Sequence, residues 1–198
     1  MEKQLIISIS REYGSGGHRI ARFLAERFQL PIYDHNLLDE IAAGKNADVE
    51  KLAKYDEAPK RHLASRSVRG FSNSPQDAIA EMQFEFLKEK AAAGESFVIV
   101  GRCSESILKE YEGLVPIFVL ADRDFKIKRV MEERHFTEKE AIAAIERHDK
   151  KRKAYHNHFA EGKWGDSRYY DLCINSSVLG LDATIDVLED FIRRKMGM

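Results

Sequence analysis

The chain has 198 residues, of which 43% are hydrophobic and 33% charged, enough for one globular domain with its own core. Its 32 basic residues nearly balance its 33 acidic residues, so nucleic acid is disfavoured as a partner. The two cysteines exclude a disulfide scaffold and a four-cysteine zinc site. No apolar run approaches the ~20 residues that cross a bilayer, and the N-terminal segment is too polar for a signal peptide. We therefore expect a cytoplasmic protein that spans no membrane.

Short apolar runs alternate with amphipathic stretches along the chain, a pattern typical of a parallel sheet with crossover helices. The first predicted strand covers residues 5–9. After a glycine-rich loop, a helix follows whose apolar face repeats at steps of three and four residues, at Ile20, Phe23, Leu24 and Phe28. A second short strand is expected at residues 30–33, with Asp34 as the N-cap of the next helix.

The second half of the chain repeats this alternation. A helix is expected to begin at Ser74-Pro75 and to end at Gly94. Buried strands are predicted at 97–100, 115–120 and 172–175. Asp122 is expected to cap a basic helix, Thr137-Glu138-Lys139-Glu140 is a capping box before a long polar helix that ends near His158, and a final helix buries Ile185, Leu188 and Ile192. The pattern predicts an α/β fold with five strands.

A glycine-rich loop, SREYGSGGHR at residues 10–19, separates the first strand from the first helix. Glycines let the backbone aim several N–H groups at one anion, and the N-terminus of the following helix adds a positive dipole end. An ordinary turn is the alternative, but the strand–loop–helix context favours phosphate binding. The residues expected to bind the donor phosphates are Arg11, Gly14, Ser15, Gly16, Gly17, His18 and Arg19.

This loop departs from the full phosphate-binding pattern G-x-x-x-x-G-K-[ST]. When Gly17 is aligned with the last glycine, Glu12 replaces the first one, His18 replaces the lysine and Arg19 replaces the hydroxyl residue. Arg19 cannot bind Mg²⁺, although a guanidinium can hold phosphate with two hydrogen bonds. The sequence therefore predicts an intact anion cradle with altered catalytic groups.

Four stretches of the chain are similar to the cytidylate kinase-like family, at residues 9–17, 98–103, 162–166 and 170–175. The resemblance covers about residues 5–190. It implies a three-layer P-loop NTPase fold with a five-stranded parallel sheet, a nucleoside-monophosphate (NMP)-binding insertion and a helical lid. It also implies transfer of the ATP γ-phosphoryl group, with Mg²⁺, to a small acceptor such as CMP.

The resemblance also implies how one domain over residues 1–198 is divided. The core would comprise about 1–33, 96–133 and 167–198, the NMP-binding insertion about 34–95, and the lid about 134–166. Arg61, Arg66 and Arg69 lie in the insertion, where each either meets a substrate phosphate or is a solvated surface charge.

Two further groups of residues are expected at the acceptor site. Arg102 follows the strand at 97–100, and the carboxyl end of such a strand faces the ligand crevice of the sheet. This position favours a contact between Arg102 and a nucleotide, and a structural salt bridge is the alternative. The resemblance implies that an acidic residue directly after Gly-Arg contacts the cytosine ring in cytidylate kinases. Cys103 occupies that position here. The lid sequence Asp149-Lys150-Lys151-Arg152 is similar to the family's Asp-x-x-Arg, which implies that Asp149 and Arg152 bind the acceptor.

Residues 147–153 hold five basic residues and one acidic residue. Because a closing lid can bring arginines to the transferring phosphoryl group, we expect catalytic roles for Arg19, Arg147 and Arg152. A solvated helix face is the other interpretation. Trp164 either stacks on a base or anchors the lid loop, and we expect no metal ligands among the histidines because His156 and His158 point apart on a helix.

The leading hypothesis is therefore a nucleotide-binding phosphotransferase whose partners are small-molecule nucleotides. The alternative is a non-catalytic nucleotide sensor or regulator on the same fold, because the P-loop lysine and hydroxyl are replaced. An RNA-binding module is the weakest of the three hypotheses, and homo-oligomerisation stays open.

Overall fold

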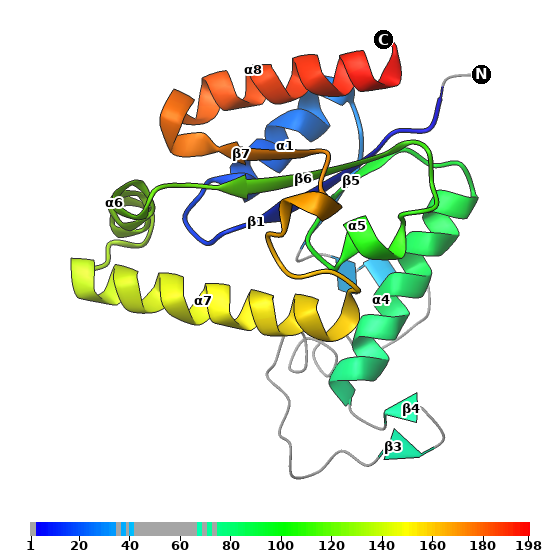
Figure 1. The fold of residues 1–198 in the computed structure, drawn as a ribbon, viewed down its shortest axis with the longest axis horizontal. Coiled ribbons are helices and arrows are strands. Elements are labelled where there is room, and N and C mark those ends of the chain that lie inside the picture. The colour runs from blue at the N-terminus through cyan, green and yellow to red at the C-terminus, as the bar shows by residue number, and fades with distance from the viewer. Residues whose placement is uncertain (1–2, 35–36, 39, 42–66, 69–70, 73–74) are drawn as a thin grey trace.

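The computed structural model describes residues 3–34, 37–38, 40–41, 67–68, 71–72 and 75–198. Its main sheet has five strands in the order β2–β5–β1–β6–β7 (Figure 1), with every neighbouring pair parallel. In that order the strands are Ile32–Tyr33, Phe97–Val100, Ile6–Arg11, Leu114–Leu120 and Leu172–Asn175. The expected five-stranded parallel sheet is confirmed.

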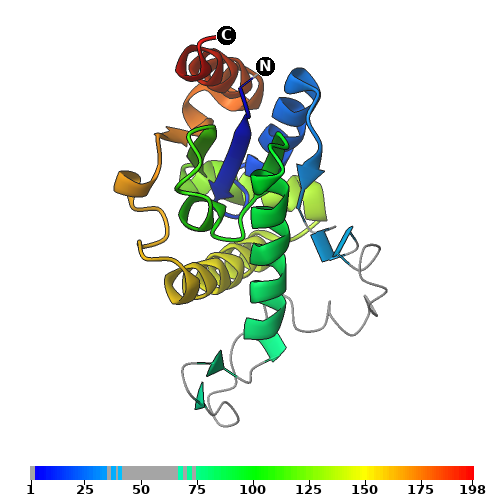
Figure 2. The same cartoon turned by 90° about the vertical axis from the view of Figure 1, so that its right-hand side faces the viewer.

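Strand β1 is at the centre of the sheet because both of its faces are buried. Successive side chains of a strand point to opposite faces, and Ile7 and Ile9 pack in one core with α1 (Gly17–Phe28) and α8 (Ser176–Met196). Ile6 packs in a second core with Leu87 of α4 (Pro75–Ala92). Figures 1 and 2 show the resulting layers, with α1 and α8 on one side of the sheet and α4 and α7 on the other.

Two further helices bring the chain back to the glycine loop. Helices α6 (Arg123–Arg134) and α7 (Glu138–Phe159) pack through a small apolar cluster, Ile127, Val130, Ala141 and Ile145, with Tyr13 of the loop against it. The capping box that begins α7 is confirmed, since Thr137 and Glu140 exchange hydrogen bonds between side chain and backbone.

Some local expectations are wrong. Phe23 is 36% exposed, so only part of the predicted apolar face of α1 is buried. Asp122 occupies the N-cap position of α6, but its side chain makes no capping hydrogen bond. Its carboxylate instead accepts a hydrogen bond from Asn175 Nδ2 at 2.8 Å. The hydrogen bonds from Asn175 and Ser177 lower the pKa of Asp122. The expected cap Ser74 and the insertion arginines Arg61, Arg66 and Arg69 lie outside the described residues.

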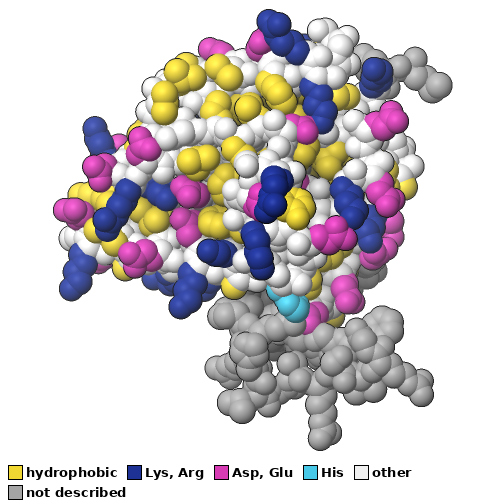
Figure 3. Space-filling view, in the orientation of Figure 1, with side chains coloured by type: hydrophobic (Ala, Val, Ile, Leu, Met, Phe, Trp, Pro, Cys, Tyr) yellow, Lys and Arg dark blue, Asp and Glu magenta, His cyan; other side chains and the backbone are white. Residues whose placement is uncertain are grey.

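Four short elements have no counterpart in the predicted set. They are α5 (Ser104–Ile107), the 3₁₀ turn η1 (Ser167–Tyr169), and the strands β3 (Ser67–Val68) and β4 (Phe71–Ser72), which pair antiparallel. Within the part of the chain that is described, no helix is long and apolar enough to cross a membrane. Basic and acidic side chains are mixed over the face shown in Figure 3.

Candidate functional site

The glycine loop connects β1 to α1 at the carboxyl end of the central strand. Gly14 and Gly16 have φ angles of 83° and 81°, in the left-handed region that glycine adopts at little cost. Ser15 stabilises the turn from inside, because its buried hydroxyl donates to the Glu12 carbonyl at 2.9 Å. Among the hydrogen bonds of the described residues, none uses the amide N–H of Gly14 or Gly16. Together with the N-terminus of α1, these groups form a site that suits an anion.

Helix α6 contacts the same loop through Lys126. A Cβ on Gly14 would lie 3.1 Å from Lys126 Cβ, which shows how closely the two segments approach. The Lys126 ammonium lies 2.8 Å from Glu12 Oε2 and 3.8 Å from Asp149 Oδ2. A lysine absent from the loop's own sequence is thus placed beside the loop by a different helix.

Helix α7 also contacts the loop, over one turn of its length. Asp149 Oδ1 accepts a hydrogen bond from the Tyr13 amide at 2.7 Å, and Arg152 donates to the Arg11 carbonyl at 3.2 Å. The His148 ring stacks on Tyr13, with the ring centroids 4.3 Å apart. Burial raises the pKa of Asp149 against the opposing effects of the Tyr13 hydrogen bond and of the Lys126 and Arg152 charges.

A small recess, with a cavity volume of about 20 Å³, lies between the ends of β1 and β5, α7 and the loop that carries Trp164. Three arginines line it, Arg11, Arg102 and Arg152. Arg102 is 6% exposed and has a left-handed backbone, with φ at 60°. Arg11 Nη1 would lie 2.6 Å from a Cβ on Gly101, so the absence of a side chain there lets the arginine enter. Three converging guanidinium groups suit a phosphate or carboxylate.

A buried acid–imidazole pair lies beside this recess. Glu105 of α5 is 6% exposed and His156 of α7 is 4% exposed, and Glu105 Oε1 lies 2.5 Å from His156 Nε2. Glu105 Oε2 also accepts a hydrogen bond from the Ser10 hydroxyl at 3.3 Å. The pair therefore joins α7 to α5 and β1.

Three of the residues expected at the site lie away from the recess. His18 is half-exposed, with its Nε2 2.6 Å from Asp34 Oδ2. Arg19 lies 3.8 Å from Asp182 of α8, with its guanidinium over the Phe23 ring. Arg147 is exposed on α7 and does not line the recess. The structure thus brings together Arg11, Arg102, Asp149 and Arg152, but not Arg19 or Arg147.

No group of three His, Cys, Asp or Glu side chains that could hold a metal ion occurs among the described residues. The hydroxyl nearest the anion site, that of Ser15, is already bonded to Glu12. Because Mg²⁺ is commonly held by one or two carboxylates together with substrate phosphates, the residues present fit a metal that arrives with a bound nucleotide rather than a metal held by protein ligands alone.

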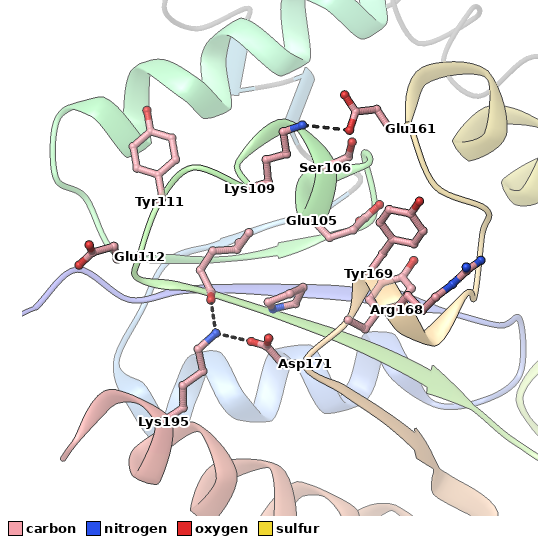
Figure 4. A pocket seen from close by; sticks show the side chains of 13 residues that line it. Glu105, Ser106, Lys109, Tyr111, Glu112, Glu161, Arg168, Tyr169, Asp171 and Lys195 are labelled. Atoms are coloured by element: carbon pink, nitrogen blue, oxygen red, sulfur yellow. Dashed lines mark hydrogen bonds and ion pairs between the residues drawn. The ribbon is translucent and has the colours of Figure 1, made fainter.

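A second hollow, drawn in Figure 4, is lined by charged side chains that pair with one another. Lys109 and Glu161 lie 2.9 Å apart, and Lys195 contacts both Asp171 and the Leu114 carbonyl (Figure 4). Because its cations are neutralised in this way, this hollow is a weak anion site.

Sequence reasoning missed Lys126, Glu105 and His156 as members of the site. A signal for His156 was present, since Asp149, Arg152 and His156 are spaced three and four residues apart and share one helix face. Lys126 and Glu105 have no such signal, because the residues that their side chains contact lie in distant segments of the chain.

Comparison with known proteins places this geometry in context. The model of the cytidylate kinase-like family matches residues 6–178. A protein named cytidylate kinase from Pyrobaculum calidifontis is 25% identical over 189 residues, which are 95% of this chain and 92% of that protein. An uncharacterised protein from Eubacterium ventriosum has a solved structure with a TM-score of 0.75 and 39% identity, covering 96% of this chain and 98% of that one.

More distant solved structures show the fold alone. A shikimate kinase from Acinetobacter baumannii, solved with shikimate, has a TM-score of 0.53 at 10% identity and covers 98% of this chain and 95% of that one. A shikimate kinase from Bacteroides thetaiotaomicron has a TM-score of 0.54 at 14% identity, over 96% and 98% of the two chains. The fold is that of a P-loop kinase, and the chain belongs to the cytidylate kinase-like family of nucleotide kinases.

Proposed function

We propose that this protein transfers the γ-phosphoryl group of ATP to a nucleoside monophosphate such as CMP. The observation that carries the proposal is the convergence of Arg11, Arg102 and Arg152, from three separate parts of the chain, on one recess beside the glycine loop. A reaction between two phosphorylated molecules requires two anion-binding sites side by side.

The donor site is the loop from Gly14 to Gly17 with the N-terminus of α1. Its amide groups bind the terminal phosphates of the donor, and Lys126 supplies the positive charge that a P-loop lysine supplies in the complete motif. His18, whose Nε2 lies 2.6 Å from Asp34 Oδ2, is at the exposed start of α1 beside this loop. Mg²⁺, bound with the donor phosphates, would neutralise part of their charge.

The acceptor site is the recess. Arg102 and Arg152 would hold the acceptor phosphate, and Arg11 lies between the donor and acceptor sites. The acceptor phosphate is itself an anionic nucleophile, so the main tasks of these residues are to position it and to stabilise the charge of the transition state.

The same proposal assigns the parts of the domain. The core would comprise about residues 1–33, 96–133 and 167–198, the NMP-binding insertion about 34–95, and the lid about 134–166. The contacts of Asp149 and Arg152 with the glycine loop support a lid that reaches the donor site. Arg147, exposed on the same helix, belongs to the proposed lid as a residue that solvent surrounds in this conformation.

A turnover assay tests the proposal. ADP formation is followed with ATP, Mg²⁺ and a panel of CMP, dCMP, UMP and AMP. We expect turnover with at least one monophosphate and a loss of about 100-fold or more in kcat/KM in Arg102→Met, since a buried charge-assisted contact is removed. Arg168→Met is the matched control, because Arg168 is 81% exposed and lies outside the recess.

The second candidate is a non-catalytic nucleotide sensor. It is favoured by the position of Arg19, which pairs with Asp182 instead of facing the loop where the motif has a metal-binding hydroxyl. Tight ATP binding without transfer to any acceptor would establish the sensor and overturn the kinase proposal.

A further inference from the structure

The pair formed by Glu105 and His156 has no task in the reaction described so far. Both side chains are more than nine-tenths buried, and the pair is held in place by α5, α7 and the Ser10 hydroxyl of β1. Moving a carboxyl group and an imidazole from water into the protein interior costs free energy. Glu105 also determines the direction of the hydrogen bond within the pair, because a carboxylate only accepts hydrogen bonds.

The carboxylate determines which imidazole nitrogen is free to act. Because Glu105 Oε1 lies 2.5 Å from Nε2, we assign the tautomer with its hydrogen on Nε2, and in that tautomer Nδ1 carries the lone pair. Nδ1 is buried and has no hydrogen-bond partner among the described residues. A buried polar atom without a partner is unfavourable by ~1–3 kcal/mol, so Nδ1 of this recess-lining residue is available to accept a hydrogen bond from a ligand.

His156 lines the same recess as the three arginines. The recess has room for one small group, so a hydroxyl or amino group of a molecule whose anion is held by Arg102 and Arg152 would lie beside His156. Tyr155 and Trp164 line the recess as well. The recess lining thus combines arginines, aromatic side chains and His156, whose Nδ1 has no hydrogen-bond partner among the described residues.

We propose that His156, positioned by Glu105, determines acceptor specificity by taking a hydrogen bond at Nδ1 from a hydroxyl or amino group of the acceptor. The chemical class that fits is a phosphomonoester that carries such a donor group on its sugar or base. This inference rests on the proposed function, because it names the chemistry of the acceptor site in that reaction.

Two pairs of monophosphates serve as probes. CMP carries an amino donor on its base where UMP has a carbonyl, with the UMP donor at the neighbouring N3–H instead, and dCMP lacks one hydroxyl of CMP. Binding of each is measured by calorimetry with the intact protein, and turnover is measured separately. In at least one pair we expect one member to bind about tenfold or more tightly, since the other member has no donor group at the position from which Nδ1 accepts, and Nδ1 is then left unpaired.

The variant His156→Gln removes this acceptor while its amide nitrogen can still reach Glu105. We expect the tenfold preference to fall to about twofold or less, with the affinity for inorganic phosphate unchanged. His156→Asn retains an oxygen near the Nδ1 position and should keep part of the preference. His158→Gln is the matched control on the same helix, because that histidine is half-exposed and pairs with Asp77. It should leave the preference intact.

One measurement needs no substitution. The ¹⁵N resonance of His156 Nδ1 should shift when the preferred monophosphate is added and should stay unchanged with inorganic phosphate. An unchanged resonance on binding, or a preference that survives in His156→Gln, overturns the inference while leaving phosphoryl transfer intact. Discrimination that depends on His156 without any transfer supports the inference and overturns the proposed kinase function. Failure of all four monophosphates of the turnover panel to bind overturns both.

Discussion

Asp149 of α7 accepts a hydrogen bond from the backbone amide of Tyr13 in the glycine loop, with 2.7 Å between Oδ1 and N. A carboxylate of the proposed lid is thus bound to a loop of the kind that holds phosphate. The same carboxylate lies 3.8 Å from the Lys126 ammonium. Movement of α7 would therefore change both the hydrogen bonding of the loop and the charge beside it.

The first prediction concerns the pH dependence of stability through Asp149. Burial raises the pKa of this carboxyl above its ordinary value of 3.8, so the folded protein holds this proton more tightly than the unfolded chain. Its contribution is most favourable below pH 3.8 and is lost as the pH rises through the raised pKa. Asp149→Asn should remove this dependence.

Urea unfolding between pH 4 and pH 7 checks this prediction. The free energy of unfolding of the wild type, minus that of Asp149→Asn, should fall as the pH rises. Asp166→Asn is a control that should stay nearly flat in this window, since hydrogen bonds from Arg168 lower the pKa of Asp166 to about 2 and its contribution is lost only as the pH falls below about 4. A difference for Asp149 that rises with pH would show that its ion pairs outweigh its burial.

The second prediction concerns Lys126 as the cation of the donor site. Lys126→Met leaves the Glu12 and Asp149 carboxylates next to the bound phosphates without the ammonium that separates them. We expect the affinity for ATP to fall about tenfold through this repulsion, measured by calorimetry well below the melting temperature. Lys128→Met, on the exposed side of α6, should bind ATP as the wild type does. Equal affinities in the two variants would exclude Lys126 from the donor site.

The third prediction separates two reasons for glycine at position 16. Its φ angle is 81°, and a Cβ there would lie 2.4 Å from Leu181 Cδ2. Gly16→Ala should lower the free energy of unfolding by roughly 2–3 kcal/mol, of which the left-handed backbone accounts for roughly 1–2 kcal/mol. In a Leu181→Ala background only the backbone part should remain. A double-mutant cycle by urea unfolding measures the coupling, and additive effects would rule out the steric contact.

The fourth prediction tests the cap that begins α7. Thr137→Ala removes the side-chain acceptor for the Glu140 amide and should lower the free energy of unfolding by about 1 kcal/mol. Thr137→Ser keeps the hydroxyl and should retain most of the stability. Thermal or urea unfolding measures both, and equal losses in the two variants would assign the effect to the lost methyl group instead of the cap.

The predicted elements that proved correct are those with a strong local signal. The strand at Phe97–Val100 has the predicted bounds, since four consecutive apolar residues before Gly101 suit a strand buried on both faces. The Thr137 capping box is also correct, because its partners are three residues apart. Phe23 shows the limit of a periodic pattern, which gives the angular position of a side chain on its helix but not the width of the face that the sheet covers.

The sequence by itself determined the five strands, the glycine loop between β1 and α1, and the balanced charge, because each depends on neighbouring residues or on composition. Only the tertiary structure decided which cations face one recess, why Arg19 lies apart with Asp182, and how Lys126, Glu105 and His156 join the site. The physical reason is the order of the sheet. With β1 between β5 and β6, segments more than 90 residues apart meet at one edge, and no local pattern in the chain specifies which of their side chains come into contact.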